Sequence, residues 1–141
     1  MAVTPKYEVV EHTADVGVRV QGATMAEVFA DAAYAMFDLM SGNEALRPQV
    51  ERTVTVDAQD REELMVNWLS ELLFIFETER LLLSEFKIAE IDERHLRATV
   101  RGERFDPERH ASNFDIKAVT YYGLHVTQDD SSWKATVIFD V

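Results

Sequence analysis

The sequence TMAEVFADAAYAMFDLMSG, residues 24–42, decides the fold. Thr24 and Glu27 have the spacing of a capping box, in which each side chain satisfies a free backbone amide at the start of a helix. Apolar residues then recur three and four positions apart, as in a helix with one buried face: Met25, Val28, Phe29, Ala32, Ala33, Met36, Phe37 and Met40. Ser41-Gly42 is a typical stop signal. The stretch therefore predicts a helix packed on the core.

A second helix is predicted to begin at Asp60, which forms a capping box with Glu63, and to end near Thr78–Arg80. Its buried positions repeat with the same helical spacing: Met65, Trp68, Leu69, Leu72, Leu73 and Phe76. Phe74 and Ile75 lie outside this stripe, so we expect the helix to be covered on more than one side. Trp68 fits the buried series, and Trp133 fits a buried strand series, so both tryptophans are expected in the core.

Alternating apolar and polar residues predict strands around the two helices. These stretches are 6–10, 16–20, 50–57, 86–91, 96–100, 119–126 and 133–139, with a hairpin turn at 92–95. The order is two strands, a helix, a strand, a helix and four strands. It predicts a two-layer α+β fold with two helices packed on a mainly antiparallel sheet. No linker composition interrupts the chain, so residues 1–141 are expected to form a single domain.

The charge balance limits the classes of partner. The chain has 14 Lys and Arg against 26 Asp and Glu, a formal net charge of −12. Such a surface repels phosphate backbones and anionic membranes, whereas it attracts cations and basic proteins. The chain contains no cysteine, which excludes disulfides and thiolate zinc sites. Neither a signal sequence nor a membrane-spanning apolar run is found, so we expect a cytoplasmic protein.

Carboxylates near the two ends of the chain are the main candidates for a metal site. Asp15 enters an apolar strand from the turn HTADVG, and Asp140 precedes Val141, whose terminal carboxylate adds a second anion. Adjacent anions repel unless a cation lies between them, and Ca²⁺ or Mg²⁺ takes oxygen ligands. If the first and last strands are neighbours, Asp15 completes a cluster of three carboxylates. The ordinary alternative is that these groups are solvated surface acids, as most Asp and Glu are.

Two further residues stand beside this candidate site. His12 lies three residues before Asp15, where a plain turn role is the alternative. Lys117, in FDIKAVTYYG, either pairs with the acidic cluster, reaches a phosphate on a partner, or covers apolar surface with its stem. The chain has no HExxH, GxSxG, EF-hand or phosphate-binding glycine loop, so a metal-dependent phosphoesterase has little support.

Six segments resemble the archease family, in the same order along nearly the whole chain: HTADVGVRV (12–20), AMFDLM (35–40), WLSELLFIFETE (68–79), GERFDPERH (102–110), IKAVTYYGL (116–124) and VIFDV (137–141). The resemblance implies a small α+β protein that is not itself an enzyme. It implies an activator of the RtcB-type RNA ligase of tRNA splicing and RNA repair, which promotes guanylylation and turnover of that ligase. Some members are linked to tRNA cytosine methylation, so a chaperone-like modulator of a tRNA methyltransferase is the alternative.

The resemblance also implies which residues form the site. It places the metal ligands at Asp15, Asp140 and Val141, with calcium as the usual ion and magnesium or another divalent ion as alternatives. Lys117 matches a position that the family uses to activate the ligase, and His12 lies in the turn of the metal site. The family commonly has histidine where this chain has Tyr122, so Tyr122 is left out of the predicted site.

Overall fold

The computed structural model describes residues 7–11, 15–42 and 46–141, which form two helices and seven strands. In chain order these are β1 (Glu8–Glu11), β2 (Asp15–Gly22), α1 (Met25–Ser41), β3 (Val50–Asp57), α2 (Arg61–Glu79), β4 (Leu81–Ile91), β5 (His95–Arg104), β6 (Ala118–Gln128) and β7 (Trp133–Asp140). The strand order is β1-β2-β7-β6 in one sheet and β3-β5-β4 in the other. Neighbouring strands in both sheets are antiparallel.

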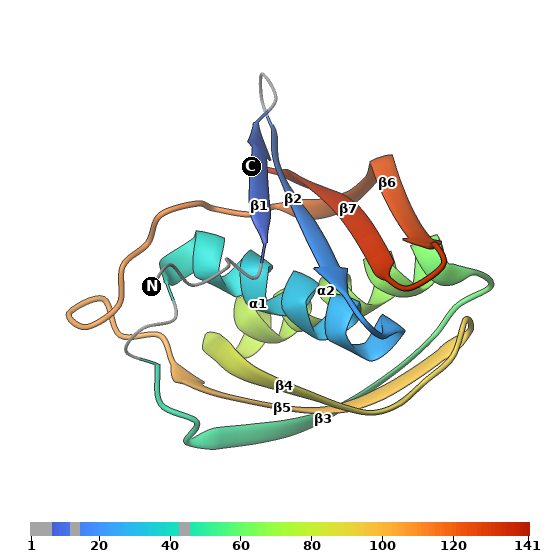
Figure 1. The fold of residues 1–141 in the computed structure, drawn as a ribbon. Coiled ribbons are helices and arrows are strands. Elements are labelled where there is room, and N and C mark those ends of the chain that lie inside the picture. Colours follow the sequence, from blue (N-terminus) through green and yellow to red (C-terminus); the bar gives the residue numbers. More distant parts are fainter. Residues whose placement is uncertain (1–6, 12–14, 43–45) are drawn as a thin grey trace, which may run out of the picture.

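The two helices lie between the two sheets (Figure 1). Helix α1 packs against β2 and β7 on one side and against β4 on the other, and α2 contacts β6 on one side and β3, β4 and β5 on the other. The predicted α+β fold, with two helices packed on antiparallel strands, is confirmed. The predicted two layers are wrong, because a second sheet covers the other side of the helices and makes three layers. Alternation within single strands did not reveal that the strands divide into two sheets, because it says nothing of which strands pair.

Both predicted capping boxes are present. The Glu27 N–H donates to Thr24 Oγ1 at 3.1 Å, and the Glu63 N–H donates to Asp60 Oδ1 at 2.8 Å. Each glutamate carboxylate accepts from the residue before the cap, the Ala23 N–H at 2.8 Å and the Gln59 N–H at 3.2 Å. These contacts fix the start of both helices, as the sequence predicts.

The helix faces confirm most of the predicted core. All eight apolar residues predicted to be buried in α1 are buried, and Trp68 is buried with its Nε1–H donating to Phe29 O at 2.9 Å. In α2 Ile75 is buried, but Phe74 is 57% exposed, so the expectation of cover at both positions is wrong for Phe74. Trp133 is only half-buried, packed on the edge of the core beneath the Arg61 guanidinium.

Most strands are present with equal or longer bounds than predicted, whereas β1 spans Glu8–Glu11 rather than 6–10. Strand β3 matches the predicted range, and the turn before His95 joins β4 to β5. Strand β4 begins at Leu81 rather than 86, because three consecutive buried leucines at 81–83 give no alternation to detect. None of the helices in the described part of the chain is long and apolar enough to cross a membrane.

Gly102 tests the packing of β5 against β4. A Cβ built on Gly102 would lie 1.9 Å from the carbonyl oxygen of Leu82, which is backbone and cannot rotate away. We expect Gly102→Ala to lower the free energy of unfolding by at least about 2 kcal/mol, because the two strands must separate. The exposed substitution Glu85→Ala on the facing strand is the control, with a change within about 0.5 kcal/mol. Urea unfolding of both variants provides the measurement, and equal stability of the two would contradict the close approach.

Candidate functional site

Asp15 and Asp140 lie opposite each other on neighbouring strands. In the register of β2 with β7, Asp15 is the partner of Asp140. Residues directly opposite in an antiparallel pair have Cβ atoms about 4.5–5.5 Å apart. It is β2, rather than β1, that pairs with the last strand. The pairing brings together two carboxylates that are 125 positions apart in the sequence, as 140 − 15 = 125.

Both aspartates belong to the outer face of the four-stranded sheet. Val16, Val18 and Val20 are buried toward the helices, so the alternate residues of β2, Asp15 among them, face outward. The same alternation on β7 buries Phe139 and leaves Asp140 exposed. The carboxylates are therefore accessible to a cation and to a partner.

The neighbours of Asp140 complete this end of the sheet. The Lys117 N–H donates to the Asp140 carbonyl oxygen at 2.7 Å, and Ala118 is the register partner of Asp140 on β6. The Val141 side chain packs on the core, which holds its backbone beside Asp140. Figure 1 shows the C-terminal end of the chain at this end of the sheet. Asp15, Asp140, Val141 and Lys117, four of the residues predicted for the site, thus meet at one sheet end.

Two further residues named in the sequence analysis are His12, which was predicted beside the metal site, and Tyr122, which was left out of it. His12 lies outside the described residues, so its place in the site stays a prediction. Tyr122 is 70% exposed and lies in an irregular stretch of β6, where the register with β7 shifts between Thr120 and His125. Gly123, with φ 66°, supplies the left-handed backbone conformation in that stretch.

The donor chemistry of the acidic pair suits a hard cation. Like charges placed directly opposite in a sheet repel, and an oxygen-preferring divalent cation removes that repulsion. Among the residues that the structure describes, no group of three or more histidine, aspartate or glutamate residues is arranged to hold a metal ion. The predicted metal ligands include only two acidic side chains, those of Asp15 and Asp140, and the third predicted ligand is the terminal carboxylate of Val141.

The match to a known family covers almost the whole described chain. Residues 7–141 match the Archease protein family. The protein archease of Methanosarcina mazei is 40% identical over 140 residues, covering 96% of each chain, and that of Methanopyrus kandleri is 35% identical over 138 residues, covering 96% of this chain and 99% of the relative. The chain belongs to the archease family.

Solved structures agree with this membership. The solution structure of Methanobacterium thermoautotrophicum protein 1598 superposes with a TM-score of 0.85 at 37% identity, covering 98% of this chain and 100% of the other. A Thermotoga maritima crystal structure, described as an archease and possible chaperone, superposes with a TM-score of 0.66 at 19% identity over 94% of each chain. The archease fold is therefore shared even where few residues are.

A buried glutamate in the segment GERFDPERH, Glu103, forms a cluster with Arg47, Arg109 and His110 that the sequence did not predict; we call it the Glu103 cluster. Glu103 on β5 is only 3% exposed, and its carboxylate accepts hydrogen bonds from the Arg47 N–H, from Arg109 at 2.5 Å and from His110 Nε2 at 2.9 Å. His110 Nδ1 accepts from the Asp106 N–H at 2.8 Å, which leaves the ring proton on Nε2 for Glu103. The one available signal was an acid followed seven residues later by a histidine within a loop.

The Glu103 cluster holds the segment that leads to Lys117. Phe105 lies between the rings of Phe76 and His110, and farther along the Asn113 N–H donates to Met40 O at 2.8 Å. The chain then reaches Lys117 and its bond to Asp140. The cluster therefore orders the loop that precedes Lys117 in the chain.

The charge on Glu103 has a consequence for acid stability. Burial acts to raise the pKa of Glu103, but the hydrogen bonds from Arg47, Arg109 and His110 outweigh it and hold the pKa below its ordinary value. A lowered pKa in the folded state stabilises the fold above the ordinary carboxyl pKa of about 4.3, and this stabilisation is lost as the pH falls through the folded value.

We expect Glu103→Gln to lower the free energy of unfolding at pH 7 by about 3 kcal/mol, because it removes the negative charge that pairs with Arg109 and His110 and leaves one acceptor oxygen in place of two. Glu108→Gln, an exposed change in the same loop, is the matched control and should alter it by less than about 0.5 kcal/mol. Urea unfolding from pH 7 to pH 3 is the measurement. The difference between wild type and Glu103→Gln should narrow below about pH 4.3, and a constant difference would contradict the role of the charge.

Proposed function

We propose that this protein activates an RtcB-type RNA ligase, promoting its guanylylation and repeated turnover without catalysing the reaction itself. The cation for this role is held by Asp15, Asp140 and the terminal carboxylate of Val141, and calcium is the ion we expect. The observation that carries the proposal is the register of β2 with β7, which sets the two aspartates opposite each other on an exposed sheet face. Membership of the archease family supports the same role.

The residues at this end of the sheet have two roles, which are binding of the cation and contact with the ligase. The carboxylates of Asp15 and Asp140 supply the negative charge and oxygen ligands, and a bound divalent cation would supply local positive charge facing the partner. Lys117 stands beside them with its backbone fixed on Asp140, so that its side chain, which is exposed, is available to an anionic group of the ligase. The segment from which Lys117 projects is held by the bonds from the Asn113 N–H to Met40 O and from the Lys117 N–H to Asp140 O.

Activation needs a preference for one state of the ligase. A partner shifts an equilibrium only by the difference between its affinities for the two states. We therefore propose that the acidic end binds the guanylylation-competent form of the ligase more tightly than the other form. The net charge of −12 accelerates encounter with a basic ligase surface and makes that encounter sensitive to salt.

The metal ligands can be tested without the ligase. We expect Asp15→Asn and Asp140→Asn each to weaken Ca²⁺ binding about ten-fold or more, because each removes one charged ligand. Extension of the chain past Val141 by two glycines should also weaken binding, since it removes the terminal carboxylate. Isothermal titration calorimetry with CaCl₂ is the measurement.

Asp130→Asn is the matched control for these variants. Asp130 is an exposed aspartate at the other end of β7, in the turn from β6, and its loss should leave the Ca²⁺ affinity unchanged. Equal weakening by Asp130→Asn would mean that Ca²⁺ responds only to the overall negative charge, and the site assignment would then be wrong.

The ligase itself provides the functional test. With a cognate RtcB-type ligase, the wild-type protein should increase ligase guanylylation and allow many ligation cycles per enzyme. Asp140→Asn and Lys117→Ala should lose most of this stimulation, whereas Asp130→Asn should keep it. Stimulation of a tRNA methyltransferase instead of the ligase would favour the chaperone-like role, and an absence of ligase stimulation by the wild type would contradict the proposal.

A further inference from the structure

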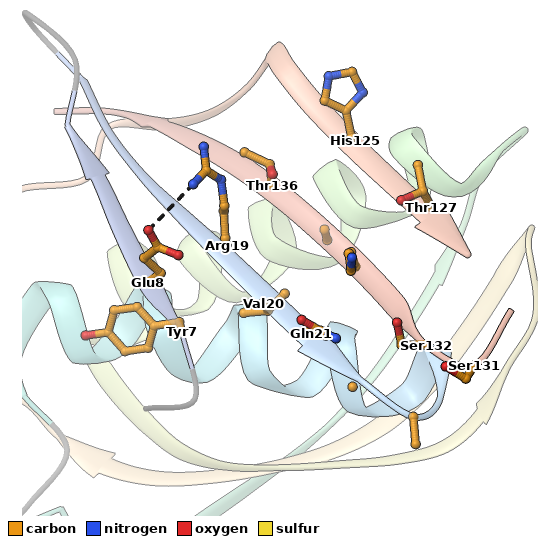
Figure 2. Close-up of a pocket in the computed structure, with 14 residues that line it drawn as sticks. Tyr7, Glu8, Arg19, Val20, Gln21, His125, Thr127, Ser131, Ser132 and Thr136 are labelled. Atoms are coloured by element: carbon orange, nitrogen blue, oxygen red, sulfur yellow. Dashed lines mark ion pairs between the residues drawn. The ribbon is translucent and has the colours of Figure 1, made fainter. Parts of the chain in front are cut away.

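The outer face of the four-stranded sheet carries a second feature, away from the acidic pair. A hollow of about 1230 Å³ lies over β1, β2, β7 and β6, toward the end of the sheet where β2 leads into α1. Figure 2 shows Arg19, Thr136 and His125 projecting from three neighbouring strands of this face. Lys134 also lines the hollow. The family resemblance and the proposed function assign no role to these residues.

The strand register explains why basic side chains gather there. Arg19 pairs with Thr136, and Thr136 pairs with His125, so these three residues form one row across β2, β7 and β6. The next row on the same face contains Gln21, Lys134 and Thr127. Side chains directly opposite are about 5 Å apart at Cβ, and diagonal neighbours are about 7–8 Å apart. Arg19 and His125 are therefore the neighbours of Thr136 on the flanking strands, and Lys134 lies two residues before it on the same face of β7.

The present partners of the two cations are weak competitors for an anion. Arg19 Nη1 lies 3.5 Å from Glu8 Oε1, and Lys134 Nζ lies 3.4 Å from Asp129 Oδ2. All four side chains are more than half exposed, and exposed ion pairs of this kind contribute little. A phosphate dianion makes stronger, charge-assisted hydrogen bonds, and the planar arginine fork binds it through two of them.

We propose that this hollow binds the phosphate group of a small phosphomonoester of about nucleotide size. Arg19 and Lys134 bind the phosphate oxygens, and the hydroxyl of Thr136 and a ring N–H of His125 donate to them. The volume exceeds the need of a bare phosphate and lies above the usual range of ligand pockets, about 300–1,000 Å³, so a ligand of nucleotide size has room in the hollow. A long polyanion is disfavoured because the rest of the chain, at a net charge of −12, repels it.

The phosphate site and the acidic pair lie at opposite ends of the outer face of the four-stranded sheet. Asp15 precedes Arg19 by four residues on β2, which is about 13 Å along a strand. Between them Ile138 is 2% exposed, covered on the outer face where Gly17 leaves room for its side chain. A phosphate held by Arg19 therefore does not reach a cation held by Asp15 and Asp140. The two sites can be tested independently, and this inference does not rest on the proposed function.

Titrations followed by amide NMR of the full chain test the proposal. The probes are inorganic phosphate, adenosine monophosphate and adenosine. We expect both phosphate-bearing probes to shift amides of β2, β6 and β7 around Thr136, with adenosine monophosphate binding more tightly and adenosine not binding. Arg19→Gln and Lys134→Gln should each weaken the binding of adenosine monophosphate about ten-fold, as expected for loss of a charge-assisted hydrogen bond.

Lys87→Gln is the matched control, because it removes one positive charge from an exposed position on β4 in the other sheet. Lys87→Gln should leave the binding of adenosine monophosphate unchanged. Equal weakening by Lys87→Gln, or an absence of shifts around Thr136, would overturn the proposal. Tighter binding of a ten-nucleotide RNA than of adenosine monophosphate would overturn the assignment to a small ligand. A failure here leaves Ca²⁺ binding and ligase stimulation unaffected.

Discussion

The antiparallel pairing of β2 with β7 is the constraint on which the rest of the site depends. It joins a strand from the start of the chain to the last strand and fixes a register of eight residue pairs, from Asp15–Asp140 to Gly22–Trp133. Since side chains alternate across a strand, one register decides every residue on both faces. The inner valines pack on α1, while Asp15 and Asp140 lie at one end of the outer face and Arg19 and Lys134 lie toward the other end. A slip of one residue would expose the valines and separate the aspartates.

The two helices explain why functional groups lie on the outer face. Because α1 and α2 each contact both sheets, their apolar faces are taken up by the core. The four-stranded sheet has one face on the helices and one face free for charged groups, as antiparallel sheets allow. The buried exception, Glu103 with Arg109 and His110, has its charge satisfied by hydrogen bonds and orders the loop that precedes Lys117 in the chain.

The sequence predicted what depends on local pattern and on chain ends. The capping boxes and the buried series of α1 follow from residue spacing. The proximity of Asp15 to Asp140 follows from the assumption that their two strands are neighbours in the sheet. The sequence did not predict the second sheet, because alternation within a strand does not show which strands pair. It also missed the start of β4 at Leu81, because a run of consecutive buried residues shows no alternation. The Glu103–His110 contact and the basic row of Arg19, Thr136 and His125 depend on side chains brought together by loops and register, which no local window contains.

A double-mutant cycle on Asp15 and Asp140 measures whether their two carboxylates share one cation site. The free energy of unfolding is measured for wild type, Asp15→Asn, Asp140→Asn and the double variant, in a chelator and again in saturating CaCl₂. We expect repulsive coupling of about 0.2–1 kcal/mol between the two carboxylates in the chelator. In CaCl₂ the coupling becomes attractive, because the ion stabilises only the folded pair. Zero coupling under both conditions would mean that the two carboxylates do not share a site.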